Sequence, residues 1–244
     1  MSETAPLPRN TVFQTSLMSA LLDSVYQGNM TVGELLTHGS FGLGTFEGLD
    51  GEMIVLDGVS YQMRVDGTVH PASLDQLTPF AVVTNLVPAI RADLPDGATG
   101  DEVTEFIDEL IPSPNYVYAL RVTGSFSEVR TRTVAKQEEP YVPMAESSKG
   151  EPVQTWSDVS GVLGGFRTPQ YLMGVSVPGY HVHFVNEDRS HGGHVLSYRL
   201  QHAAVEISPA MSLEVSLPDT PSFRGANLLP EDLSEQIHAT EQHS

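Results

Sequence analysis

The chain has 244 residues, a length that can bury a substantial core in one large domain or in two small lobes that share a site. Its 31 acidic and 12 basic residues give a formal net charge of -19, and no Lys/Arg cluster occurs that could follow a phosphate backbone, which argues against nucleic acid as a partner. Because this charge repels anions at long range, an anionic substrate would need a local positive feature such as an arginine or a metal ion.

The sequence contains no cysteine, which excludes disulfides, thiolate zinc sites and a cysteine nucleophile. A transition-metal site must therefore use histidine with carboxylate or water. The opening MSETAPLPRN lacks the basic start and apolar run of a secretory signal. The best apolar stretch, PFAVVTNLVPAI, is shorter than the about 20 residues that span a bilayer. We therefore expect a cytoplasmic protein with no membrane partner.

The first part of the chain is predicted to hold two helices and then a β-meander. Residues 1–12 are predicted to form a flexible tail, and the leucine spacing predicts a helix over residues 13–26. A Thr-Val-Gly-Glu capping box at residues 31–34 begins a short second helix. The strands of an antiparallel meander are then predicted from short apolar runs separated by Asp-Gly pairs at 50–51, 57–58 and 66–67.

The rest of the chain is predicted to be rich in strands. A helix is expected over residues 101–110, followed by strands over residues 117–124 and 126–135 that are joined near Gly124-Ser125. Residues 136–152 form a polar stretch whose length is more typical of a functional loop than of a connector. Strands and Gly/Pro turns then alternate through YHVHFVN, GHVLSYRLQ and MSLEVSLP.

These elements predict an α+β fold with mainly antiparallel β-sheets in two lobes and a few helices. An N-terminal α+β lobe with the meander is expected over residues 13–114, and a C-terminal β-rich, metal-binding lobe over residues 115–244. The lobes would form one functional unit that shares a site.

The stretch GYHVHFVNEDRSHGGHVLSY holds four of the nine histidines. Side chains alternate along a strand, so His181 and His183 project from the same side, roughly 7 Å apart. A polar hairpin loop would return the next strand beside them and bring in a third imidazole, which is the arrangement of a catalytic zinc site with one open position. The third ligand is His191 or His194, and we favour His194 because a strand holds a ligand more rigidly than a turn.

Other interpretations of these histidines stay open. Isolated histidines on a wet sheet face need no metal. Glu187, four positions after His183, partly matches the metal-binding pattern of cupins, which would indicate a cupin-type metal oxygenase. A non-catalytic module that binds a metal or a small ligand is a further alternative on the same β scaffold.

Charged residues elsewhere in the chain have two interpretations each. Arg130 and Arg132 alternate with threonines in VRTRTV, so they form either a solvated strand face or a site for an anionic substrate, which guanidinium binds in a bidentate manner. Glu52 follows the Asp50-Gly51 turn and is either an exposed hairpin residue or a carboxylate that points into a site.

Several long segments in the same order resemble the α-acetolactate decarboxylase family. They are HGSFGLGTFEGLDGEMIVLDGVSYQ, TPFAVVT, VRTRTVAKQEEPY and GFRTPQYLMGVSVPGYHVHFVNEDRSHGGHVLSY. The resemblance covers nearly the whole chain and implies a zinc-dependent carbon-carbon lyase that converts 2-acetolactate, an anion, to acetoin and carbon dioxide. It also implies two lobes around the metal and a homodimer.

The same resemblance implies the metal ligands, which are His181, His183 and His194. A second, C-terminal glutamate of the family is expected to approach the metal and take part in catalysis. Glu241 in HATEQHS is its match, with Glu235 as a competitor.

The resemblance further implies the residues that act on substrate. Arg132 is expected to orient the substrate carboxylate, and Thr45 in GTF to touch the substrate. Glu52 is expected to donate or relay a proton to the carbon that loses carbon dioxide. The zinc would stabilise an enediolate as a Lewis acid, so no organic cofactor is expected.

Overall fold

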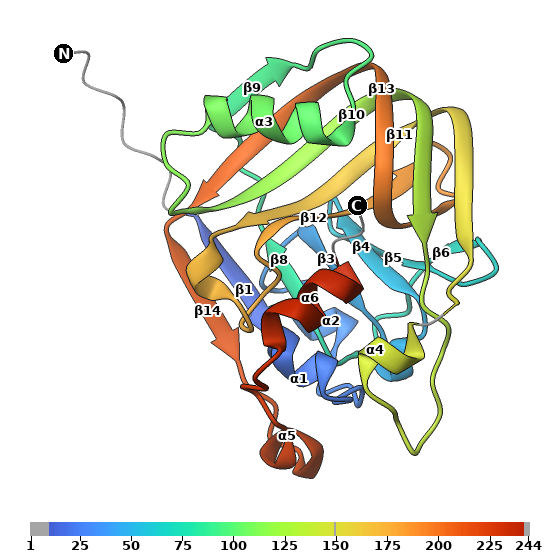
Figure 1. The fold of residues 1–244 in the computed structure, drawn as a ribbon, viewed down its shortest axis with the longest axis vertical. Coiled ribbons are helices and arrows are strands. Elements are labelled where there is room, and N and C mark those ends of the chain that lie inside the picture. The colour runs from blue at the N-terminus through green and yellow to red at the C-terminus, as the bar shows by residue number, and fades with distance from the viewer. Residues whose placement is uncertain (1–9, 149, 242–244) are drawn as a thin grey trace.

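The computed structural model describes residues 10–148 and 150–241, except for the side chain of Glu241. Two large β-sheets form the framework of this part of the chain (Figure 1). The helices are short and lie at the margins of the sheets. The predicted α+β class with mainly antiparallel sheets is therefore confirmed.

The first sheet has seven strands in the order β14-β1-β8-β3-β4-β5-β6, and every neighbouring pair is antiparallel except β1 and β14. The strands are β1 (Thr11–Thr15), β3 (Phe41–Thr45), β4 (Glu52–Leu56), β5 (Val59–Met63), β6 (Val69–Pro71), β8 (Ala81–Thr84) and β14 (Ser212–Ser216). Strands β3 to β6 are the predicted meander. A separate pair joins β2 (Met30–Thr31) to β7 (Leu77–Thr78).

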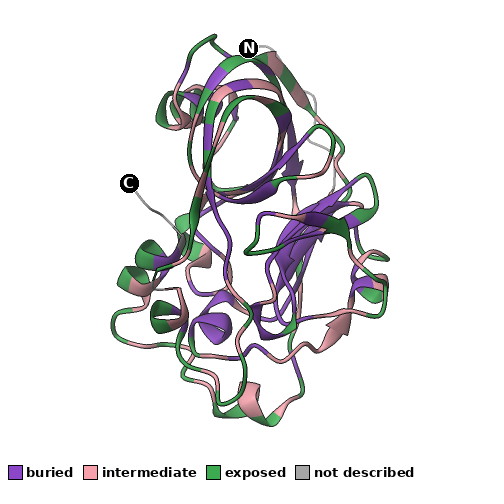
Figure 2. Ribbon diagram, turned by 90° about the vertical axis from the view of Figure 1, so that its right-hand side faces the viewer, coloured by how far each residue is buried: buried purple, intermediate pink, exposed green. Residues whose placement is uncertain are grey.

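The second sheet closes on itself, because β10 and β12 each pair with both β11 and β13. Figure 2 shows this closure as a ring of ribbon above the first sheet. Its strands are long: β10 (Val117–Arg132), β11 (Val153–Thr168), β12 (Gly179–Asn186) and β13 (Gly192–Ala210), with β9 (Ile90–Asp93) added to β13. We call this four-stranded closed sheet the barrel.

The longest helix, α3 (Gly100–Leu110), packs on the barrel through Val103 and Ile107 and begins with a capping box made by Thr99 and Glu102. The remaining helices are α1 (Met18–Leu22), α2 (Val32–Leu35), α4 (Met144–Ser147), α5 (Pro221–Gly225) and α6 (Leu233–Glu241), with 3-10 turns η1 (Glu47–Leu49) and η2 (Gln170–Leu172). The capping box predicted for α2 is present between Thr31 and Glu34. No helix in the described part of the chain is long and apolar enough to cross a membrane.

Buried apolar residues form three clusters in the described part of the chain: one joins the barrel to α3, one lies between the barrel and the first sheet, and one packs α2 on the first sheet. Phe126 and Phe184 meet edge to face in the barrel, with ring centroids 5.5 Å apart. Phe41 of β3 and Phe166 of β11 meet similarly, at 6.3 Å, in the cluster between the sheets. The barrel and the first sheet therefore share a packed interface, and the three histidines lie at this interface.

Two element predictions are wrong. The helix predicted over residues 13–26 is instead β1 followed by the short α1, and Ser16 between them has a positive φ of 64°. The predicted turn near Gly124-Ser125 is absent, because β10 runs through it as one strand held on both edges by β11 and β13. An irregularity in the pairing with β13 lies beside this point.

The two sheets do not divide at the predicted domain boundary, because each contains a strand from the other side of it. Residues 1–9 of the predicted tail lie outside the described residues, while Thr11 and Val12 belong to β1. Strand β9 precedes residue 114 yet joins the barrel sheet, and β14 follows it yet joins the first sheet. The division at residues 114 and 115 stays a prediction.

Candidate metal centre

Three histidines come together on one face of the β12–β13 hairpin. His183 pairs directly with His194 across the two strands, and His181 lies two residues earlier on β12, so it points to the same side. The ring centroids are 5.1 to 5.4 Å apart. One ligand atom of each residue lies within 4.8 Å of those of the other two, and all three residues are buried. This group is able to hold a metal ion.

The orientation of His183 fits a metal ligand. Its Nδ1 lies 2.7 Å from the backbone carbonyl oxygen of Met53, and a carbonyl only accepts, so Nδ1 carries the proton and donates. The lone pair is then on Nε2, which is buried and has no hydrogen-bond partner among the described residues. A metal ion would satisfy this nitrogen, and a backbone acceptor on the other nitrogen is common for zinc-bound histidine.

Burial keeps the imidazoles of His181 and His183 neutral. It lowers the pKa of His183 to about 4, with a smaller contribution from the positive charge of Arg132 and an opposing one from the Met53 carbonyl. Burial also lowers the pKa of His181 well below its usual value, helped by His183 and Arg132. Metal binding requires the neutral form, so these two histidines are ready to bind a cation at neutral pH.

Glu52 and Thr45 reach this site from the first sheet. Glu52 begins β4, is buried, and places Oε2 3.6 Å from Nε2 of His183. Thr45 ends β3, directly opposite Glu52, and its hydroxyl donates to the carbonyl oxygen of Gly51 at 2.8 Å. The turn at residues 46–51 therefore places a carboxylate beside the histidines.

Arg132 lies beside the histidines on a neighbouring strand of the barrel. It ends β10 and pairs with His194 on β13 and with Val153 on β11. Its side chain is only 4% exposed and is ion-paired with Glu151, whose side chain is 6% exposed. One guanidinium nitrogen, Nη2, also donates to the backbone carbonyl of Thr240 in α6. A positive charge is thereby buried close to the candidate metal site.

Residues 133–152 connect β10 to β11, and we call them the covering segment. Met144, in its short helix α4, lines a cavity of about 20 Å³ together with Thr45, Glu52 and the three histidines. The hydroxyl of Tyr26 donates to the carbonyl of Val142, and the backbone amide of Gln137 donates to the carbonyl of Gly48. The segment thus spans from the barrel to the first sheet. The cavity that it covers has room for about one water molecule.

The structure separates other predicted residues from this group. His191 stacks on Trp156 with centroids 4.5 Å apart and lies outside the group, which contains His194 instead. Arg130 is exposed, whereas Arg132 is buried at the end of β10, where Glu151 of the covering segment and Thr240 of α6 contact it. Glu187 is exposed and is not in the group, which weakens the cupin interpretation.

The two C-terminal glutamates considered for the site are Glu235 and Glu241, and both belong to α6. Glu235 is exposed on α6 and lines a separate cavity beside Gln170 and Pro178. Glu241 is the last residue of α6, and its side chain lies outside the described residues. The neighbouring Thr240 is buried, and its carbonyl contacts Arg132, so the end of α6 does approach the site.

Sequence reasoning missed Glu151 and Met144. Both lie in the polar stretch 136–152, which is recognisable as a functional loop but carries no periodicity that would show which side chains turn inward. Burial raises the pKa of the Glu151 carboxyl, whereas the guanidinium of Arg132 opposes that shift. The position of Glu151, two residues before the strand partner of Arg132, is visible only once the β10–β11 register is known.

A larger cavity of about 450 Å³ lies between α3 and the barrel, and its lining includes Tyr180, Tyr198 and several aliphatic side chains. None of the three clustered histidines lines it. Among the described residues, the one group of at least three side chains positioned to hold a metal ion is His181, His183 and His194. Size alone therefore does not identify the candidate site.

Comparison with known proteins gives a consistent result. The family model described as alpha-acetolactate decarboxylase matches residues 12–230. Proteins named alpha-acetolactate decarboxylase from Klebsiella aerogenes and Bacillus subtilis strain 168 are 43% and 41% identical over 234 residues, which is 96% of this chain and 90% and 92% of theirs.

Solved structures agree with the sequence relatives. The crystal structure of alpha-acetolactate decarboxylase from Bacillus subtilis strain 168 matches with a TM-score of 0.93 and 41% identity, over 95% of this chain and 99% of that one. A Staphylococcus aureus protein of unknown function, described as similar to alpha-acetolactate decarboxylase, matches with a TM-score of 0.92 and 30% identity, over 95% of this chain and 100% of that one.

Proposed function

The chain belongs to the alpha-acetolactate decarboxylase family, and we propose that it is a zinc-dependent lyase that converts 2-acetolactate to acetoin and carbon dioxide. The observation that carries this proposal is the group of three buried histidines beside Glu52 and Arg132. Such a site offers a metal, a carboxylate and a positive charge to a small anionic keto acid.

Zinc is the metal that we propose for the site. His181, His183 and His194 would hold it, and three imidazoles with an open position are the usual ligand set of a catalytic zinc ion. The cysteine-free sequence and the unsatisfied Nε2 of His183 are consistent with this choice. When bound, zinc would supply a Lewis acid that stabilises negative charge on substrate oxygens.

The reaction needs a place for an electron pair and a source for one proton. When the bond to the carboxylate carbon breaks, its electrons stay on the carbinol carbon and delocalise into the adjacent ketone, which gives an enediolate. A proton added to the same carbon then yields acetoin. The substrate itself is the electron sink, so the protein has to orient the carboxylate and deliver the proton.

Arg132 and Glu52 are the residues that we propose for these two tasks. The guanidinium of Arg132 would orient the leaving carboxylate, since it is buried next to His194 in a protein that otherwise repels anions. Glu52 would donate or relay the proton, because its carboxyl lies within 3.6 Å of the His183 nitrogen that faces the candidate metal site. Thr45 would contact the substrate from the cavity wall.

Glu241 completes the proposed catalytic set. The carbonyl of Thr240, the residue before it, contacts Arg132, which supports a role for the end of α6 near the metal. We favour Glu241 over Glu235 because Glu235 is exposed. Glu241→Gln and Glu235→Gln distinguish them, since we expect the first variant alone to lose activity.

A single assay tests the function. Purified protein is given 2-acetolactate with and without a chelator, and acetoin and bound metal are measured. Acetoin formation that the chelator abolishes and added zinc restores supports the proposal. A zinc-loaded protein that forms no acetoin would favour the binding module, and iron content with oxygen uptake would favour the oxygenase.

We also propose that the chain forms a homodimer in the cytoplasm. The dimer rests on the family resemblance, and light scattering after size-exclusion chromatography measures it directly. A monomer that retains full activity would remove the dimer from the proposal.

A further inference from the structure

The guanidinium of Arg132 donates hydrogen bonds to described residues from different parts of the chain. Nη1 donates to Oε2 of Glu151 in the covering segment, and Nη2 donates to the carbonyl of Thr240 in α6. Arg132 itself ends β10 beside His194. One side chain therefore joins the barrel, the covering segment and the C-terminal helix next to the candidate metal site.

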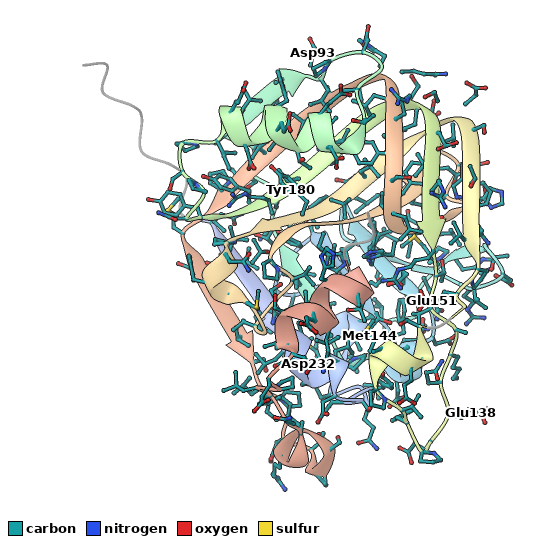
Figure 3. All side chains as sticks on the ribbon, in the orientation of Figure 1. Asp93, Glu138, Met144, Glu151, Tyr180 and Asp232 are labelled. Carbon is teal, nitrogen blue, oxygen red and sulfur yellow. The ribbon has the colours of Figure 1, made fainter. Side chains whose placement is uncertain are left out.

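Glu151 is unusual among the acidic residues of the covering segment. Glu138, Glu139 and Glu146 are exposed, whereas the Glu151 side chain is 6% exposed and turns inward (Figure 3). A carboxylate buried in this way costs free energy unless it is paired and hydrogen-bonded. In a chain with a net charge of -19, a buried carboxylate at a site for an anion needs a specific purpose.

We propose that Glu151 is a positioning residue, which holds the guanidinium of Arg132 in place for the substrate carboxylate and fixes the covering segment over the site. The positioning depends on the carboxylate oxygen of Glu151 that accepts the hydrogen bond from Arg132. The length of the side chain matters because this oxygen must reach Nη1 across the β10–β11 edge. The negative charge of Glu151 weakens substrate binding, because it offsets the attraction of Arg132 for an anionic substrate.

Acceptor and charge can be separated by substitution. Glu151→Gln keeps the length and one acceptor oxygen but removes the charge. Glu151→Met keeps a similar length without a comparable acceptor. Glu151→Asp keeps the charge but shortens the reach. Glu146→Gln, on the exposed part of the same segment, is the matched control.

This inference rests on the proposed function, so the main readout is decarboxylation of 2-acetolactate by metal-loaded protein at a pH above neutral. For Glu151→Gln we expect kcat within about threefold of wild type, with a lower KM because the opposing charge is gone. For Glu151→Met we expect kcat/KM to fall about 10- to 100-fold, the scale of a small misplacement of an orienting group. Glu146→Gln should behave as wild type.

Two results would overturn the proposal. One is wild-type kcat/KM in Glu151→Met, whether or not its melting temperature falls, and the other is a loss in Glu151→Gln as large as in Glu151→Met. If Glu151→Met does not fold, Glu151→Asp takes its place and should lose more kcat than Glu151→Gln. An Asp variant as active as the Gln variant would also overturn it.

A second readout does not depend on activity. Limited trypsin digestion, mapped by mass spectrometry, should cut within residues 136–152 faster in Glu151→Met than in Glu151→Gln or wild type. If wild-type protein forms no acetoin, the proposed function fails, and the digestion pattern alone decides whether Glu151 fixes the segment. Equal digestion of all variants would overturn the proposal that Glu151 fixes the covering segment.

Discussion

The Nδ1 atom of His183 and the backbone carbonyl of Met53 are 2.7 Å apart, and this hydrogen bond joins the barrel to the first sheet. Met53 follows Glu52 on β4, so the strand that carries the candidate proton donor also sets the tautomer of a candidate metal ligand. A shift of β4 would therefore disturb both groups together. The two sheets must pack correctly for the site to exist.

Removal of one clustered histidine should remove the metal. Loss of a hydrogen-bond partner of a metal ligand lowers metal affinity by about 10- to 100-fold. His194→Ala removes a ligand itself, so we expect a larger fall in metal affinity and no acetoin formation. Metal content after dialysis, measured by mass spectrometry, checks this. His191→Ala is the matched control, because His191 lies in the same hairpin but stacks on Trp156 outside the group. Equal metal loss in both variants would contradict the assignment.

Glu52→Gln should separate metal binding from chemistry. The amide keeps the shape of the side chain but is not a proton donor of comparable acidity, so we expect zinc to stay bound while kcat falls about 100- to 10,000-fold. Metal content and initial rates on the same sample measure the two effects. Glu47→Gln, an exposed glutamate from the same turn region, should leave both unchanged. Full activity in Glu52→Gln would remove this residue from the mechanism.

The histidine group was predictable because local rules determine it. Alternation along a strand places His181 and His183 on one face, and a polar hairpin of the observed length returns His194 opposite His183. The meander was equally readable from its Asp-Gly turns. In each case the partners are close in the sequence, so spacing carries the information.

Features that depend on distant partners were not predictable. Residues 11–15 pair with β8 and with β14, some 70 and 200 residues away, so the first part of the predicted helix is a strand and only the short α1 forms at the leucines. The burial of Arg132, but not of Arg130, depends on its contacts with Glu151 and with Thr240, which is 108 residues away. The burial of Glu151 depends on where the whole covering segment folds back. None of these leaves a periodic signal in the sequence.

Thr45→Val should destabilise the turn that carries Glu52. The Thr45 hydroxyl donates to the Gly51 carbonyl in a buried setting, and valine leaves that carbonyl without this donor. We expect the free energy of unfolding to fall by about 1–3 kcal/mol, with a higher KM if Thr45 also touches substrate. Urea denaturation and steady-state kinetics measure the two effects. Thr45→Ser keeps the hydroxyl and should recover most of the stability, and a serine variant as unstable as the valine variant would contradict this explanation.

Metal-free protein should lose stability as the pH falls through the weakly acidic range. Burial lowers the pKa of His183 to about 4, whereas an unfolded histidine titrates near 6.5, so between these values the unfolded state binds more protons than the folded state. The stabilising effect of the neutral imidazole is fully present above about pH 6.5 and is lost progressively as the pH falls towards 4, to a total on the order of 3 kcal/mol. His181, whose pKa is also lowered, adds to the loss in the same direction. Urea denaturation of chelator-treated protein across this range measures the slope. His183→Gln, which cannot titrate there, should show a shallower dependence, and an unchanged slope in that variant would show that another group is responsible.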